Sequence, residues 1–284
     1  MRFKLTIEYA GTRYSGWQIQ KNARTIQGEI DRALREVTRD RDFELYGSGR
    51  TDAGVHALAQ VAHLDIATTV PPDTLRRQLN ELLPSDINIL RIEKVRHRFH
   101  ARHQAVARSY IYQIARRRTA FAKPWVWWVK DHLDVAAMRE AAAHFVGRHD
   151  FRSFSDDDAD DKSTEVVLET ADIHEDGDLI VVHIEGSHFV WKMVRRLVGV
   201  LVEVGRGAMS ARDAAALLTT ESNVPARLTA PASGLFLERV FYEGEARDLP
   251  VQAAVVLPAG DALQRPPDQF SRRLAGGTIP LRRR

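Results

Sequence analysis

The chain of 284 residues contains no cysteine. Disulfide bonds, cysteine-ligated zinc, iron–sulfur clusters and thiol nucleophiles are therefore excluded. The sequence also has no apolar run that approaches the roughly 18–20 residues needed to cross a bilayer. Its first segment, MRFKLTIEY, alternates like a β-strand and lacks the apolar core and cleavage site of a signal peptide. We therefore expect a cytoplasmic protein that is not associated with a membrane.

Several common catalytic patterns are missing as well. Gly47–Arg50 lacks the lysine of a Walker phosphate-binding loop, and no Ser-His-Asp set can be picked out. Two isolated histidines, His56 and His63, are expected to be structural. Three evenly spaced histidines have no partnering acid and do not predict a metal site: His97, His100 and His103.

Basic residues are present in excess, but they are unevenly placed. The formal net charge is only +3, yet Arg91–Arg118 holds nine Lys or Arg against one acid, Glu93. With aromatic residues among them (Phe99, Tyr110 and Tyr112), they suit a phosphate backbone whose bases are available for stacking. The alternative is a solvated basic face whose aromatic residues belong to the core.

The order of apolar patterns predicts an α+β fold. Residues 1–105 read as strand, helix, strand, strand, helix, strand, the ferredoxin-like or split βαβ arrangement. A similar order in residues 106–246 predicts a second half, with mainly antiparallel sheets flanked by helices and a basic cleft between the halves. Residues 247–284, rich in Pro and Arg, are expected to be a partly ordered tail, either adding non-specific RNA affinity or simply solvated. Asp156–Asp161 predicts an acidic loop that stays clear of any polyanion.

The stretch Tyr46–Ala59, YGSGRTDAGVHALA, organises the first half. It predicts a strand, a turn that contains several glycines and a second strand. Glycine allows positive φ and close approach of the backbone to a ligand, so the loop could present Arg50 and Asp52. The alternative is an ordinary hairpin loop with a surface Arg-Asp pair. The turn Ala10–Gln18, with two glycines, two aromatic residues and an arginine, could contact RNA or could simply be anchored to the core.

A long apolar helix, expected at about Phe189–Val204, carries basic residues that need an explanation. If Arg195 packs partly inside, it must find an anion. Asp52 would serve, and the pair would keep Asp52 ionised, as a nucleophile or a general base requires. The alternative is that Arg195 extends to the surface.

The stretch Gly49–Ala57, GRTDAGVHA, resembles the signature of the TruA-type tRNA pseudouridine synthases. Further matches follow in the same order over about 240 residues, at 9–11, 14–18, 99–102, 108–112, 149–154, 189–199 and 230–235. The family often has Asp where Ala10 stands and a basic residue where Ser163 precedes Thr164, and these departures concern RNA contacts more than chemistry. The tail beyond about Glu245 is longer than the family usually needs.

The resemblance implies roles for particular residues. Asp52 would be the catalytic aspartate, acting as nucleophile or general base. Arg195 would pair with it, and Arg50 would support flipping of the uridine. Tyr110 would stack on the uracil. From the basic segment itself, we expect further substrate contacts by Arg102, Arg108 and His100.

The resemblance also implies the reaction and its partner. Uridine would be isomerised to pseudouridine without a cofactor or metal, at positions 38, 39 and 40 of the tRNA anticodon stem-loop, by a homodimer. Two alternatives are a non-catalytic RNA-binding protein and a pseudouridine synthase that acts at another tRNA site.

Overall fold

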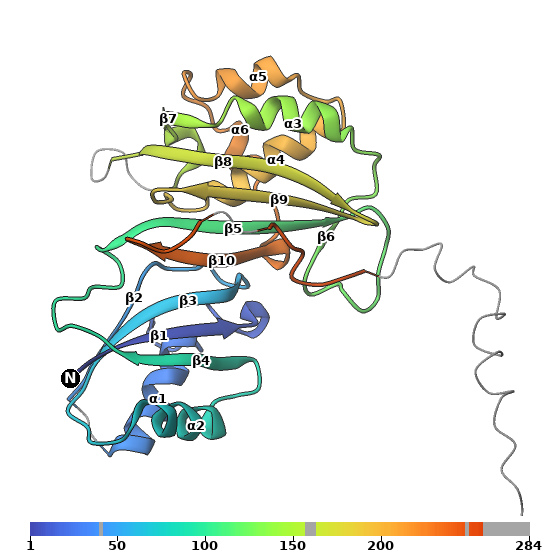
Figure 1. Cartoon of the computed structure of the whole chain (residues 1–284). Coiled ribbons are helices and arrows are strands. Elements are labelled where there is room, and N and C mark those ends of the chain that lie inside the picture. Colours follow the sequence, from blue (N-terminus) through green and yellow to red (C-terminus); the bar gives the residue numbers. More distant parts are fainter. Residues whose placement is uncertain (40–41, 157–162, 248–249, 258–284) are drawn as a thin grey trace, which may run out of the picture.

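The computed structural model describes residues 1–39, 42–156, 163–247 and 250–257 (Figure 1). Within these residues, ten strands form one mixed sheet whose main path runs β4-β1-β3-β10-β5-β9-β8-β7, with β2 paired to β3 and β6 to β5. The strands are β1 (Arg2–Tyr9), β2 (Glu44–Gly47), β3 (His56–Asp65), β4 (Ile87–Lys94), β5 (Ala105–Ala115), β6 (Trp127–Trp128), β7 (Gly147–Asp150), β8 (Glu165–Asp176), β9 (Leu179–Gly186) and β10 (Leu235–Tyr242). The α-helices are α1 (Ile26–Thr38), α2 (Pro72–Leu82), α3 (Val135–Ala143), α4 (Met193–Gly205), α5 (Ala211–Ala216) and α6 (Val224–Arg227).

The first half follows the predicted element order. Strand β1 lies between β3 and β4 and is antiparallel to both. Its alternate residues Phe3, Leu5 and Ile7 are buried, as the alternation predicts. Helix α1 begins after Thr25, whose hydroxyl caps the helix by accepting a hydrogen bond from the backbone N–H of Gly28. Helices α1 and α2 lie beside these strands and close one hydrophobic core (Figure 1).

The second half is built on the antiparallel strands β5, β9 and β8, with α3–α6 beside them (Figure 1). Its core surrounds the apolar face of α4. The predicted helix of about Phe189–Val204 starts four residues later, at Met193, because Lys192 takes a left-handed conformation with φ of 64°. The apolar pattern continues through residues 189–192, but these residues form a turn that packs on the core before the helix begins.

The two halves share the sheet because β10, a late element in the sequence, lies between β3 and β5. Its pairing with β3 is parallel, Phe236 with His56 and Leu237 with Ala57, whereas its pairing with β5 is antiparallel. The mainly antiparallel α+β fold is confirmed, and the sheets of the two halves are continuous through this strand. The loop that precedes β3 is thereby brought close to α4.

The chain beyond β10 is described as far as Leu257, apart from residues 248–249. Arg247 forms ion pairs with Glu169 and Glu185, and the backbone N–H of Val255 donates to the Gln113 side chain at 3.1 Å. Leu257 is buried in a separate apolar cluster with Phe236 and Val181. Apart from Arg247, the arginines of the predicted tail 247–284 lie outside the described residues. No helix in the described part of the chain is long and apolar enough to cross a membrane.

Candidate active site

The glycine loop is held in place by the preceding segment Tyr9–Gln18. The Tyr9 hydroxyl and the Thr51 side chain are hydrogen-bonded at 2.8 Å, and the backbone N–H of Trp17 donates to the Thr51 carbonyl at 3.1 Å. Gly16 has a φ of +90° and lies so close that a Cβ there would come within 2.6 Å of the Thr51 carbonyl oxygen. Because Tyr14 and Trp17 are buried, the structure favours anchoring to the core over RNA contact for the turn Ala10–Gln18.

The loop itself has the predicted strand–turn–strand form. Strands β2 and β3 are antiparallel, and Gly54 has the positive φ, +81°, that the glycine pattern predicts. The backbone N–H of Val55 donates to the Asp52 carbonyl at 3.2 Å, which closes the turn just before β3. Asp52 therefore stands on a short turn anchored to the sheet.

The two histidines near this loop are structural, as predicted. His56 Nδ1 accepts a hydrogen bond from the backbone N–H of Gly11 at 3.0 Å, and its Nε2 donates to the Pro124 carbonyl at 3.2 Å. His63 Nδ1 accepts from the backbone N–H of Ala101. Burial lowers the pKa of each imidazole to about 4, so both rings are neutral at physiological pH.

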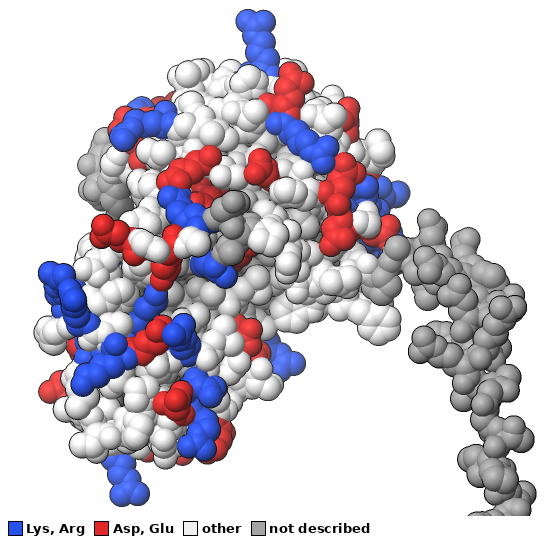
Figure 2. All heavy atoms as spheres, in the orientation of Figure 1, with Lys and Arg blue, Asp and Glu red and all other residues white. Residues whose placement is uncertain are grey.

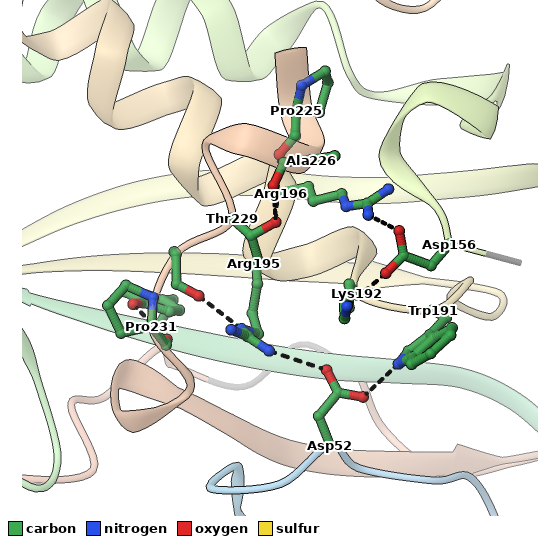
Figure 3. A network of polar contacts seen from close by, with 12 residues as sticks. Asp52, Asp156, Trp191, Lys192, Arg195, Arg196, Pro225, Ala226, Thr229 and Pro231 are labelled. Atoms are coloured by element: carbon green, nitrogen blue, oxygen red, sulfur yellow. Dashed lines mark hydrogen bonds and ion pairs between the residues drawn. The ribbon is translucent and has the colours of Figure 1, made fainter. Parts of the chain in front are cut away.

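The carboxylate of Asp52 meets two donors from α4 and the turn before it (Figure 3). Arg195 Nη1 donates to Oδ2 at 3.3 Å, and Trp191 Nε1 donates to Oδ1 at 3.0 Å. Arg195 Nε also donates to the Ala230 carbonyl at 2.7 Å, which fixes the guanidinium between two acceptors. The structure thus has the predicted Asp52–Arg195 pair, and Arg195 does not extend away to the surface.

Close packing of α4 explains the position of the Ala230 carbonyl. A Cβ at Gly199 would lie 1.7 Å from the Leu228 carbonyl oxygen, so only glycine allows the helix to approach this segment. The backbone N–H of Ala230 in turn donates to the Arg195 carbonyl at 3.0 Å. Arg195 is therefore held by its own backbone as well as by its side chain.

The turn before α4 is fixed by one acidic residue, Asp156 (Figure 3). Its carboxylate forms ion pairs with Lys192 and Arg196, and its backbone N–H donates to the Trp191 carbonyl at 3.4 Å. The Arg196 side chain is only 4% exposed, so Asp156 supplies the anion that this buried guanidinium needs. The rest of the predicted acidic loop, from Asp157 to Asp161, lies outside the described residues.

Tyr110 lies on β5 with its ring packed edge-on against Phe189, at 5.0 Å between ring centroids. Burial raises the pKa of the phenol to about 12; the positive charge of Arg108 opposes this rise, and the negative charge of Asp52 adds to it to a smaller extent. The phenol is therefore uncharged at physiological pH.

The other predicted site residues differ in how they are engaged. Arg50 and Arg102 are exposed, and within the described residues their guanidinium groups have no recorded hydrogen bond or ion pair. Arg108 donates from Nη1 and Nη2 to four backbone carbonyls, those of Ser48, Arg102, Ala105 and Ser187. Arg108 thus ties the glycine loop to the second half, and its predicted phosphate contact stays a prediction.

His100 belongs to a cluster of aromatic rings. Its imidazole lies 4.2 Å from that of His103, 4.7 Å from that of His63 and 5.1 Å from the ring of Tyr46, between centroids. Its Nδ1 accepts hydrogen bonds from the backbone N–H groups of Arg102 and His103. Burial, followed by the neighbouring positive charges, lowers the pKa of His100, so its predicted contact with substrate would be made by an uncharged ring.

The basic segment is less strongly positive in the fold than in the sequence. Arg116 and Arg117 form ion pairs with Glu175 and Asp178 from the β8–β9 hairpin, and Arg91 pairs with Glu93. On the face shown in Figure 2, acidic side chains lie among the basic ones over both halves. An RNA partner would therefore depend on particular exposed cations rather than on uniform positive charge.

Trp191 is the site residue that the sequence did not reveal. It stands in an apolar stretch that reads as helix, and a tryptophan there is indistinguishable from a core residue by pattern alone. The turn that precedes α4, with Lys192 in the left-handed region, directs the Trp191 side chain toward Asp52. No residue type in this stretch signals that the chain forms a turn instead of a helix there.

Comparison with known proteins identifies the class. A family model described as tRNA pseudouridine synthase matches residues 5–104 and 141–243. The chain belongs to this family, whose members are isomerases, as the motifs around Asp52 predicted.

Individual relatives are similar over most of their length. The chain is 44% identical over 245 residues to tRNA pseudouridine synthase A of Rhodopseudomonas palustris, covering 85% of this chain and 99% of the relative. It is 38% identical over 243 residues to tRNA pseudouridine synthase A 2 of Clostridium tetani, covering 84% and 98%. Both matches leave part of this chain uncovered.

Proposed function

We propose that this protein isomerises uridine to pseudouridine at positions 38, 39 and 40 of the tRNA anticodon stem-loop, with Asp52 as the catalytic carboxylate. The observation that carries the proposal is the carboxylate of Asp52, which stands on an anchored glycine loop and accepts hydrogen bonds from Arg195 and Trp191. The relatives named tRNA pseudouridine synthase A support tRNA as the substrate.

The reaction breaks the C1′–N1 bond of the nucleotide, turns the uracil and joins C1′ to C5. The hydrogen on C5 leaves as a proton and N1 gains one, so the oxidation state does not change. Asp52 acts either by attack on C1′ or by removal of a ribose proton, and both routes need a carboxylate with a free lone pair. Within the described residues, each of its two oxygens accepts one hydrogen bond, which leaves a lone pair on each.

The neighbouring residues have complementary roles in this proposal. Arg195 holds Asp52 and balances its charge, and the neutral ring of Tyr110 stacks on the uracil. Arg50, exposed and two residues before Asp52 in the same loop, occupies the space left by the flipped uridine, since a base in the stack cannot be reached at C1′ and C5. Exposed Arg102 contacts phosphate, and His100 contributes to the same substrate surface.

The test is release of tritium from tRNA labelled at C5 of its uridines, because closure of the new bond must expel that hydrogen. Transcripts that keep uridine only at positions 38, 39 or 40 are compared with transcripts that keep it only elsewhere. We expect wild-type protein to release tritium from the first set alone. Release from the second set alone would move the activity to another tRNA site. Binding of tRNA without release from either set would favour the RNA-binding alternative.

The homodimer implied by the family resemblance is part of the same proposal, with tRNA lying across both subunits. Light scattering on the purified protein gives its mass in solution directly. A mass near twice the 32.1 kDa of one chain is expected. A single-chain mass together with full activity would remove the dimer from the proposal and leave the reaction intact.

A further inference from the structure

Trp191 combines exposure with a specific polar contact. Half of its surface is exposed, at 50%, which is unusual for so large an apolar residue, yet its indole N–H is committed to Oδ1 of Asp52. We propose that Trp191 is a positioning residue, which fixes the orientation of the Asp52 carboxylate for reaction. This inference rests on the proposed function of Asp52 and extends it.

Arg195 alone would hold the carboxylate loosely. It makes one recorded contact to Asp52, at 3.3 Å, and its Nε is engaged by the Ala230 carbonyl. Rotation of a carboxylate about its Cβ–Cγ bond is soft, so one donor at that distance leaves the plane of the group poorly defined. The second donor, Trp191 at 3.0 Å, binds the other oxygen and fixes the plane (Figure 3).

The turn that carries Trp191 is built to hold it. Lys192 follows in a left-handed conformation, with φ of 64° and ψ of 1°, which a residue with a side chain adopts only when its surroundings compensate. Asp156 supplies that compensation by binding Lys192, Arg196 and the backbone carbonyl of Trp191. The Lys192 ammonium also lies 4.8 Å from the centroid of the indole ring. Trp191 is therefore presented by a fixed turn, although its outer face is open to solvent.

The first test observes the hydrogen bond without any catalysis. The chain has five tryptophans, so ¹⁵N-labelled protein gives five indole N–H signals, and Trp191→Phe identifies the one from Trp191. In Asp52→Ala this signal should move upfield, because the proton loses its acceptor, while the other four stay in place. An unchanged Trp191 signal in Asp52→Ala would overturn the proposal.

The second test measures positioning through the rate of the bond-forming step. Trp191→Phe keeps a ring and loses the N–H donor, and a hydrogen bond to a charged group is worth about 10- to 100-fold in rate. We expect the single-turnover rate of tritium release to fall by that factor, with the tRNA Kd and the melting temperature close to wild type. The matched control is Trp128→Phe, on β6, whose ring is 42% exposed and lies near Arg118 instead of Asp52.

The outcomes separate this inference from the proposed function. A normal single-turnover rate in Trp191→Phe, or a loss entirely in tRNA Kd, would show that Trp191 does not orient Asp52 for reaction. If wild-type protein releases no tritium, the proposed function fails, and the positioning role fails with it even where the indole signal responds to Asp52→Ala. A fall in rate with unchanged affinity, together with that spectral response, supports both.

Discussion

At the scale of single residues, the site depends on a few donors directed at one carboxylate. Asp52 and Arg195 come from opposite halves of the chain, 143 positions apart, and meet through one hydrogen bond. Their pairing could be anticipated because an arginine in an apolar helix needs an anion. The contact from Trp191 could not, because its direction depends on a backbone conformation that the pattern of apolar residues does not encode.

Removal of the carboxylate should abolish activity while the fold persists. In Asp52→Asn the side chain keeps its size but loses its charge and most of its basicity, so either chemical route fails. We expect the rate of tritium release to fall by at least about 10²–10⁴-fold, with tRNA binding retained. A variant with near wild-type release would show that another residue is the catalytic group.

Replacement of Arg195 by lysine tests whether geometry as well as charge matters. A lysine ammonium can reach one acceptor but cannot span both Asp52 and the Ala230 carbonyl as the guanidinium does. We expect kcat/KM to fall by about 10- to 100-fold in Arg195→Lys, the value of one charge-assisted hydrogen bond. Arg227→Lys, an exposed substitution on α6, is the matched control and should be neutral.

At the scale of elements, α4 and the turn before it decide the shape of the site. Most elements were predictable, because strand alternation and caps such as Thr25, Asp134 and the Ser210–Asp213 capping box act locally. The start of α4 could not be predicted, because Lys192 leaves the helical region of φ and ψ where its ammonium binds Asp156, a residue 36 positions away. Local pattern cannot report such a long-range contact.

Asp156→Asn should destabilise the protein by leaving Arg196 buried without its anion. The expected loss in free energy of unfolding is about 3 kcal/mol at pH 7, the lower end for a broken buried ion pair, because Asp156 itself is partly exposed. Urea unfolding measures it. Glu93→Gln, which removes an exposed pair with Arg91, should cost no more than about 1 kcal/mol.

The stability that the protein loses in Asp156→Asn should depend on pH. Burial opposes ionisation of Asp156, but the hydrogen bonds from Lys192 and Arg196 outweigh it, so its pKa lies below the ordinary value. A carboxyl with a lowered native pKa stabilises the fold fully above its ordinary pKa of about 4, and loses that contribution as pH falls toward the native value. The stability difference between wild type and Asp156→Asn should therefore shrink between about pH 5 and pH 3. A difference that stays constant over this range would contradict the ion-pair explanation.

At the scale of the whole molecule, the arrangement of the strands in space differs from their order in the chain. The succession of elements could be predicted from the sequence, but the position of β10 between β3 and β5 could not. Several orders of the same strands bury equivalent faces, and the choice depends on contacts between residues far apart, such as Phe236 with His56. The division into residues 1–105 and 106–246 remains a prediction.

Truncation tests what the chain beyond β10 contributes. A chain that ends after Leu257 keeps the buried cluster of Leu257, Phe236 and Val181, and should melt like the full protein. A chain that ends after Arg247 exposes that cluster, and the loss of a buried leucine alone is worth about 1.5–3 kcal/mol. We expect a lower melting temperature and binding of a hydrophobic dye for the shorter chain. Equal melting of the two chains would show that residues 248–257 do not stabilise the sheet.

The place of β10 also has a consequence for synthesis on the ribosome. Strands β3 and β5, with the segments that carry Asp52 and Tyr110, emerge early, and α4 with Arg195 follows, but the strand that lies between β3 and β5 is translated last among the ten. Until Tyr242 has left the exit tunnel, the two parts of the site have no shared sheet to hold them together. A nascent chain therefore has no competent site until β10 has emerged and paired with both β3 and β5.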